Sequence, residues 1–173
     1  MSIAEVWGAT PAECALSFPC DGLVANADAL FRAIDVDAPA HVAFRWLCQL
    51  RAAPYSYDWL DNGGRRSPQT LTPGLDALAV GQKVMRIFDL VAFEPDRHLT
   101  LRLNGEGGIF GDVAVTYLVV PRAADCARYV VKLCWRYPDM MGLGLIARAL
   151  LPWGDFVMMR KQLLTLKMLA EGR

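Results

Sequence analysis

The sequence predicts an α+β fold in which a curved antiparallel β-sheet wraps around one long C-terminal helix. Three observations predict it: a strand followed by a helix before residue 54, four β-rich runs after Gly81, and a long helical region at the end. Strand-rich and helix-rich segments in this order are typical of an α+β layout. The apolar share of 54% in 173 residues suits one large core, or a core hollowed around an apolar ligand.

The composition indicates one domain and argues against several classes of protein. We expect an irregular arm over residues 1–27 and a single domain over residues 28–173, because periodic elements begin only there. The 18 basic and 18 acidic side chains balance, so no basic surface for nucleic acid is expected. The five cysteines are odd in number and lack a C-x-x-C spacing, which indicates reduced thiols in a cytoplasmic protein.

Neither a secretion signal nor a membrane span is expected. The stretch "MSIAEVWGAT" at the start lacks both a basic segment and an apolar one. The most apolar stretch, "MMGLGLIARALLPWGDFVMM", is interrupted by Arg148, Pro152 and Asp155. These interruptions argue against a helix that crosses a bilayer, so no stable membrane insertion is expected.

The first regular elements are a strand and a helix. Alternation in "ADALFRAIDVDAP" predicts a strand that carries three side chains on one face, namely Arg32, Ile34 and Val36. Pro39 can open the helix that follows, with Asp37 as its cap, and Pro54 ends it. Helical spacing in "PAHVAFRWLCQLRAA" predicts a buried stripe made of Val42, Trp46, Leu47 and Leu50.

Four β-rich runs follow, and their short connections predict an antiparallel meander. The runs are "KVMRIFDLVAFEP", "HLTLRLNG", "GIFGDVAVTYLVVP" and "ARYVVKLCWRYP". Alternation is clearest in the last two. One face of the third run should hold Val113, Val115, Tyr117 and Val119. One face of the fourth should hold Tyr129, Val131, Leu133, Trp135 and Tyr137.

The closing helical region should consist of two helices. Pro152 and Gly154 are expected to divide it, with Asp155 as the cap of the second helix. Helical spacing gives one apolar stripe made of Phe156, Met159, Leu163, Leu166 and Ala170. It gives a second stripe made of Val157, Leu164 and Met168. Two stripes predict a helix that is enclosed on more than one side.

These elements resemble a known superfamily. The strand "FRAIDVDAPA", the helix "HVAFRWLCQL", the meander and the closing helix are similar to the SRPBCC proteins, which are START-like and include polyketide cyclases, aromatases and lipid carriers. The segments "APYSYDWLDN", "GDVAVTY" and "LPWGD" resemble an uncharacterised bacterial branch. The resemblance covers about residues 28–171 and implies a helix-grip ligand-binding domain with a deep apolar cavity. It implies no particular reaction, because members range from carriers to enzymes.

The stretch "YSYDWLDNGGRRSP" supplies the first candidate site residues. The rings of Tyr55, Tyr57 and Trp59 could line one end of a cavity, and Asp58 could accept a hydrogen bond from a ligand. Arg65 or its neighbour Arg66 could pair with a carboxylate. The alternative is structural: the aromatic rings plug the edge of the sheet, and Asp58 satisfies backbone groups in a turn.

Further candidates come from the sheet and the closing helix. Asp112 begins a strand, where it could serve as a general acid or base or could bind turn amides. Tyr117 and Trp135 could line a cavity or pack in an ordinary core, and the same holds for Met159 and Leu163. His41 and His98 lie on different elements, so neither a metal site nor a cofactor is expected.

Three functions remain open on the sequence alone. The leading hypothesis is that an internal cavity binds a hydrophobic or aromatic small molecule, a lipid among them. The second is an enzyme of the cyclase, aromatase or dehydratase kind, in which Asp58 and Asp112 are candidate catalytic groups with Tyr57 and Tyr117. The third is an interaction module that forms a homodimer through Phe156 and Leu163.

Overall fold

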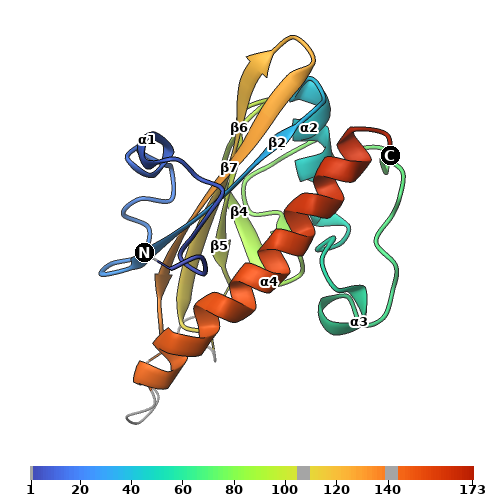
Figure 1. Ribbon diagram of the computed structural model, residues 1–173. Helices are drawn as coiled ribbons and strands as arrows, with labels where there is room; N and C mark the ends of the chain where they lie inside the picture. The colour runs from blue at the N-terminus through green and yellow to red at the C-terminus, as the bar shows by residue number, and fades with distance from the viewer. Residues whose placement is uncertain (1, 105–109, 139–143) are drawn as a thin grey trace.

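A long helix lies across one face of a β-sheet in the computed structural model, which describes residues 2–104, 110–138 and 144–173 (Figure 1). The helix is α4 (Gly144–Ala170). Together they form the α+β helix-grip arrangement, so the predicted fold class is confirmed. Residues 105–108 of the expected connection "NGEGG", residues 108–109 at the start of the third β-run, and the expected start of the helical region at 142–143 lie outside the described residues.

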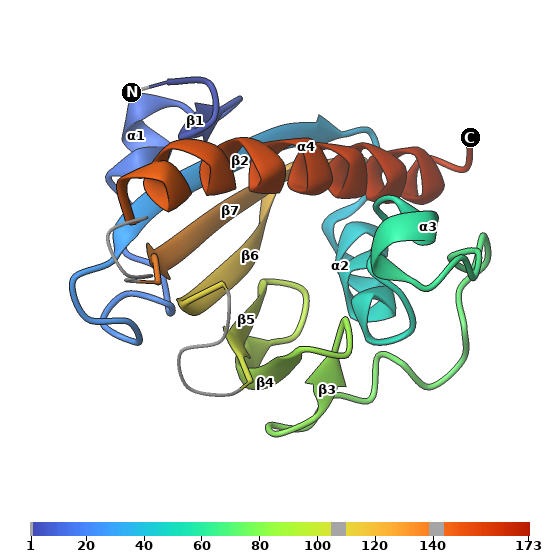
Figure 2. The same ribbon diagram turned by 90° about the horizontal axis from the view of Figure 1, so that it is seen from below.

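Within the described residues, the sheet has seven strands and stays open. The strands are β1 (Val6–Trp7), β2 (Asp28–Val36), β3 (Lys83–Val84), β4 (Phe88–Glu94), β5 (His98–Leu103), β6 (Asp112–Ala123) and β7 (Cys126–Arg136). Their spatial order is β1-β2-β7-β6-β5-β4-β3, and the sheet twists away from α4 towards β3 (Figure 2). The antiparallel meander from β4 to β7 is confirmed.

Two details of the sheet differ from the prediction. β1 pairs with β2 in parallel, so the sheet is mixed rather than wholly antiparallel. The run that begins at Lys83 is split into β3 and β4, because Met85 and Arg86 have φ angles of 48° and 67°. That left-handed backbone interrupts a strand, since side-chain sterics there oppose extended pairing.

The predicted alternation in the strands is confirmed. On β6, Val113, Val115 and Tyr117 are buried in the main core, and on β7 so are Val131 and Leu133. Register places Tyr117 opposite Val131. Arg32 shares the α4-facing side of β2 with Val36, and it is the one charged residue in that buried row. The main core therefore lies between this face of the sheet and the helices α2 and α4.

The helix after β2 forms as expected, except at its start. α2 (Ala40–Cys48) continues into a short 3-10 turn, η1 (Gln49–Arg51), and ends before Pro54. Asp37 was expected to cap α2, but none of the described side chains caps this end, and Pro39 holds the N-cap position. The backbone N–H of Asp37 instead donates to the Glu171 carboxylate at 2.9 Å. The C-terminus of α4 is thereby tied to the turn before α2.

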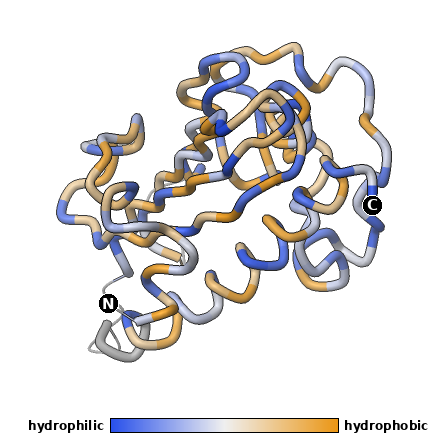
Figure 3. The backbone as a smooth tube through the Cα atoms, turned by 45° about the horizontal axis from the view of Figure 1, so that its top comes forward, coloured by the Kyte–Doolittle hydropathy of each residue, from blue (hydrophilic) through white to orange (hydrophobic). Residues whose placement is uncertain are grey.

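α4 is one continuous helix, so the prediction of two helices is wrong. Pro152 lies inside it, and Asp155 caps nothing, because its carboxylate pairs with Arg32. A proline removes one backbone hydrogen bond, and packing against the sheet holds the helix together across that gap. Hydrophobic and hydrophilic residues alternate along α4 (Figure 3).

One of the two apolar stripes of α4 is buried. Met159, Leu163 and Leu166 lie in the core, as predicted. In the second stripe, Val157 and Met168 are 46% and 41% exposed, so the prediction of a helix enclosed on two sides is wrong. The physical reason is that α4 packs on one layer only, so the face of the helix that points away from that layer is exposed to solvent. None of the described helices is both long and apolar enough to cross a bilayer.

The N-terminal segment covers the outer face of the sheet, opposite α4. It contains a short helix, α1 (Pro11–Cys14), with a capping box formed by Thr10 and Glu13. A second apolar cluster joins it to the sheet and consists of Phe18, Cys20, Val24, Phe31, Ala33, Ala114, Val130 and Cys134. Residues 1–27 were expected to be an irregular arm, but they contain β1 and α1; the capping-box spacing of T-P-A-E is the signal that would have indicated α1.

Candidate functional site

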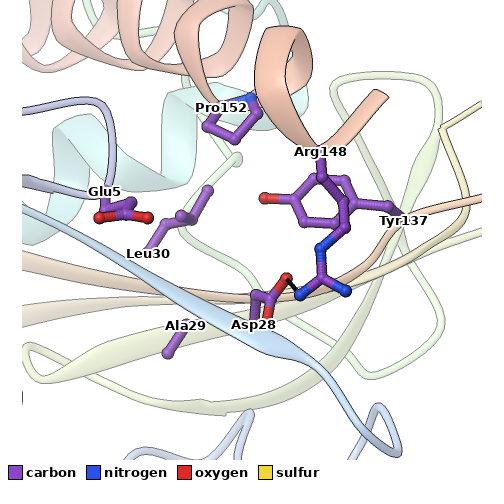
Figure 4. Close-up of a pocket in the computed structure, with 7 residues that line it drawn as sticks. All are labelled: Glu5, Asp28, Ala29, Leu30, Tyr137, Arg148 and Pro152. Carbon is purple, nitrogen blue, oxygen red and sulfur yellow. Dashed lines mark hydrogen bonds and ion pairs between the residues drawn. The ribbon is translucent and has the colours of Figure 1, made fainter. Parts of the chain in front are cut away.

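A pocket opens between the first half of α4 and the start of β2 (Figure 4). Its volume is about 250 Å³. β2, α4, the N-terminal segment and the residue after β7 all contribute to it. The lining residues are Glu5, Asp28, Ala29, Leu30, Tyr137, Arg148 and Pro152.

The rim of the pocket carries an ion pair. The Arg148 guanidinium donates to Asp28 Oδ2 at 2.6 Å and lies 5.9 Å from the centre of the Tyr137 ring (Figure 4). Both charged side chains are more than 40% exposed, at 59% and 44%. The pair is therefore screened by water, and a ligand can replace Asp28 as the partner of Arg148 at small cost.

Tyr137 forms one wall of the pocket. Its ring packs against Trp135 with centroids 4.9 Å apart, and the Trp135 indole N–H donates to the Phe110 carbonyl at 2.6 Å. Burial raises the pKa of the Tyr137 hydroxyl to about 12. The hydroxyl therefore stays protonated near neutral pH and can donate a hydrogen bond into the pocket.

A buried ion pair stands beside the pocket. Arg32 follows Leu30 by two residues on the same face of β2, and Asp155 follows Pro152 by three on α4. Arg32 Nη2 lies 2.8 Å from Asp155 Oδ2. Burial raises the pKa of Asp155 to about 6, although the charge of Arg32 opposes the rise. A carboxyl group with a raised pKa thus lies on the same turn region of α4 as the pocket residue Pro152.

The pocket combines an apolar floor with a charged rim. Leu30, Pro152 and the Tyr137 ring provide the floor, and Glu5, Asp28 and Arg148 provide the rim. Its volume is just under the range usual for drug-sized ligands, so it fits a small ring or one end of a longer molecule. In the described part of the chain, one group of three metal-type donors is found, Cys20, Asp21 and Cys134, on the opposite face of the sheet.

The stretch around α3 (Asp58–Asp61) lies near the other end of α4 (Figure 2). Tyr55 is 1% exposed and packs edge-on against Trp46, while Trp59 is 74% exposed. Both Asp58 oxygens accept hydrogen bonds from Ser67, at 2.8 Å from its N–H and 2.6 Å from its hydroxyl. Asp58 therefore stabilises a turn, which is the structural role predicted as the alternative to binding a ligand. Tyr57 is half-buried, and Arg65 and Arg66 are exposed.

The other predicted site residues are divided between the two faces of the sheet. Asp112 points away from α4 and lies 3.3 Å from Arg102 and 3.6 Å from Arg136. In the core, the Tyr117 hydroxyl donates to Gln162 Oε1 at 2.7 Å. The structure brings Tyr117, Met159 and Leu163 together in the core between the sheet and α4. The Trp135 ring packs against the ring of Tyr137. A ligand role for these residues stays a prediction.

The residues of the pocket were not among the predicted site residues. Arg32 offered a signal, because a charged side chain on an otherwise apolar strand face needs a buried partner. Tyr137 belonged to the predicted aromatic row, but its place at the end of β7 did not mark it as an opening. Nothing local distinguishes Arg148, since its partner Asp28 is 120 residues away.

Comparison with known proteins places the chain by its fold. No protein-family model matches the sequence, and no curated protein matches it. Among solved structures, the ZhuI aromatase/cyclase from Streptomyces sp. R1128 superposes with a TM-score of 0.58 at 14% identity, over 84% of this chain and 94% of that one. The chain has the helix-grip fold. The fold that the resemblance implied is therefore confirmed, and membership of the SRPBCC superfamily stays a prediction.

Two further solved structures are similar to the chain over most of its length. A protein from Mesorhizobium loti matches with a TM-score of 0.52 at 18% identity, over 84% of this chain and 98% of that one. A protein from Arthrobacter aurescens matches with a TM-score of 0.55 at 11% identity, over 85% and 88% of the two chains. Identities this low establish a shared architecture and leave the chemistry to be argued from the site.

Proposed function

We propose that the chain binds a hydrophobic or aromatic small molecule between the sheet and α4, with the pocket beside β2 as its site. The observation that carries the proposal is the meeting of an apolar floor with an exposed ion pair in one pocket. A ring would lie on Leu30 and against Tyr137, and an anionic or polar group of the ligand would reach Arg148.

Burial of apolar area would supply the binding energy. A ring that buries about 150 Å² gains about 4 kcal/mol at roughly 25 cal/mol per Å² before entropy losses. The loss of translational and rotational freedom on binding offsets much of that gain. A charge-assisted bond to Arg148 would strengthen binding and fix the orientation of the ligand.

Native mass spectrometry and a fluorescent probe test this proposal. Freshly purified protein is expected to carry a lipid or polyketide-like mass, or to bind the anionic aromatic probe anilinonaphthalene sulfonate when empty. Arg148→Met should weaken probe binding about threefold to tenfold, because the sulfonate loses its partner. Arg45→Met is the matched control, since Arg45 is similarly exposed, at 52%, and lies on α2.

A second variant distinguishes probe binding in the pocket from probe binding on other apolar surfaces. Tyr137→Ala removes one wall of the pocket and should weaken binding at least as much as Arg148→Met. If the empty protein binds no probe, or if neither variant changes its affinity, the pocket is not the ligand site.

The alternative is an enzyme of the cyclase, aromatase or dehydratase kind that uses the same cavity. It is favoured by Asp155, whose pKa of about 6 suits proton transfer near neutral pH, and by the protonated Tyr137 hydroxyl. A poly-β-keto thioester is the test substrate. Loss of turnover with retained binding in Tyr137→Phe would favour the enzyme over the carrier, and Asp58→Asn and Asp112→Asn test the predicted catalytic groups in the same assay.

A further inference from the structure

Two cysteines face each other on the outer side of the sheet, away from the pocket. Cys20 belongs to the N-terminal segment and Cys134 to β7, and their sulfur atoms are 3.7 Å apart. Both are free thiols and both are buried, with 0% and 6% exposure. The backbone N–H of Cys20 donates to the Thr116 hydroxyl at 3.1 Å, which fixes Cys20 over the sheet.

The surroundings of the two thiols make them unequal. The hydrogen bond that Cys134 donates to Cys20 lowers the pKa of Cys20 to about 7, although burial opposes this. The same bond, together with burial, raises the pKa of Cys134. The Asp21 carboxylate disfavours the Cys20 thiolate, and the Lys132 ammonium group, which Asp21 holds at 2.6 Å, partly offsets this effect. Cys20 is therefore the nucleophile of the pair, and Cys134 keeps its proton.

We propose that a hydroperoxide oxidises Cys20 and Cys134 to a reversible disulfide. This disulfide links the N-terminal segment covalently to β7. A disulfide needs the sulfur atoms about 2 Å apart, so the pair must close by roughly 1.7 Å. Cys20 lies in a turn without a strand partner, which lets its side chain make that movement. The Asp21 side chain beside the pair is 39% exposed and Cys134 retains 6% exposure, so this side of the pair lies close to the protein surface.

The chemistry balances in two steps. The Cys20 thiolate attacks the hydroxyl oxygen of the hydroperoxide, an S–O bond forms and the O–O bond breaks, so that Cys20 becomes a sulfenic acid. The other oxygen leaves as an alkoxide or hydroxide and takes up the proton that Cys20 released on ionisation, which gives an alcohol or water. The Cys134 sulfur then attacks the Cys20 sulfur, the S–O bond breaks, and the departing hydroxide takes the Cys134 proton to form water. Two thiols lose two electrons, and the hydroperoxide gains them.

A metal ion is the competing occupant of this cluster. Ligand atoms of Cys20, Asp21 and Cys134 all lie within 4.8 Å of one another, which is a workable spacing for a divalent cation. However, the Lys132 ammonium already occupies the Asp21 carboxylate, and its positive charge opposes a second cation. The geometry therefore favours the disulfide.

Thiol counting on the full chain tests the proposal. The reduced protein is treated with a few equivalents of hydrogen peroxide, unfolded, alkylated with N-ethylmaleimide and weighed. Of the five cysteines, three should be alkylated after oxidation and five after dithiothreitol, with a mass loss of about 2 Da before alkylation. Peptide mapping should link Cys20 to Cys134. Amide hydrogen exchange in the segment around Cys20 should slow on oxidation.

Matched variants make the result specific. Cys20→Ser and Cys134→Ser should each abolish the internal disulfide, whereas Cys48→Ser, which alters a buried thiol elsewhere in the core, should retain it. Five alkylated thiols after peroxide, a link between other cysteines, or unchanged amide exchange would overturn the proposal. So would one equivalent of zinc bound by the untreated protein that protects both thiols from peroxide.

Discussion

Arg32 and Asp155 join the sheet to α4 through an ion pair of 2.8 Å inside the protein. Arg32 has no exposed side-chain surface, and Asp155 retains 14%. The Arg32 Nη1 and Nη2 groups also donate to the carbonyls of Ala4, Glu5 and Phe31 at 2.7 to 3.0 Å, while its buried Nε–H has no partner among the described residues. One side chain thus holds the N-terminal segment, β2 and α4 together, next to the pocket.

Removal of one partner of this pair should destabilise the protein strongly. Asp155→Ala leaves the buried Arg32 charge without its carboxylate, which should cost about 3 kcal/mol of unfolding free energy. Urea unfolding followed by circular dichroism measures the change. The double variant Arg32→Met/Asp155→Leu should be more stable than Asp155→Ala, because it leaves no unpaired charge. Glu94→Ala, at an exposed pair with Arg97, should change stability by less than about 1 kcal/mol.

Acid should loosen the N-terminal segment through Glu13. Burial opposes ionisation of Glu13, but hydrogen bonds from Arg128 and Thr10 prevail and lower its pKa from 4.5 to about 2. A carboxyl group with a lowered pKa in the folded state stabilises it above pH 4.5, and this contribution is lost as the pH falls towards 2.

The variant Glu13→Gln isolates that contribution. It should lower the free energy of unfolding by about 2 kcal/mol near pH 7, because Arg128 loses a charged partner. The difference from the unmodified protein should shrink below about pH 4.5 and vanish near pH 2. A difference that stays constant across this range, measured by urea unfolding, would contradict the assignment.

Gly8 should tolerate no side chain. Its φ angle is 74°, and a Cβ atom there would lie 2.1 Å from the carbonyl oxygen of Ala33. Gly22 has a similar φ of 79°, but nothing lies within 4 Å of the place of its Cβ. Both alanine variants share the backbone strain, so Gly8→Ala should be about 2 kcal/mol less stable than Gly22→Ala. Equal unfolding midpoints would contradict the close approach of the two segments.

The hydroxyl of Tyr117 should matter to stability more than that of a loop tyrosine. Tyr117→Phe leaves the buried Gln162 carbonyl oxygen without its donor and should cost about 2 kcal/mol. Tyr57 is half-buried on the loop before α3, so Tyr57→Phe should change the unfolding free energy by less than about 0.5 kcal/mol. Thermal unfolding of the two variants side by side provides the measurement.

Local patterns determined much of the fold. The alternation of Val113, Val115 and Tyr117 set the inward face of β6, and helical spacing set the buried stripe of α4 from Met159 to Leu166. These patterns depend only on neighbours within a few residues, and the two periods of strand and helix are distinct. The short connections between the runs likewise required an antiparallel meander, which is the arrangement found.

Only the tertiary structure decided which distant residues meet. Arg32 and Asp155 are 123 residues apart, and Cys20 and Cys134 are 114 apart. The continuity of α4 through Pro152 and the exposure of its second apolar stripe also depend on which single surface the helix covers. Periodicity in the sequence indicates that a side chain is buried, but the residue that it contacts depends on how the helices pack on the sheet. The pocket lies where such layers meet, and so the sequence by itself determined the scaffold and not the site.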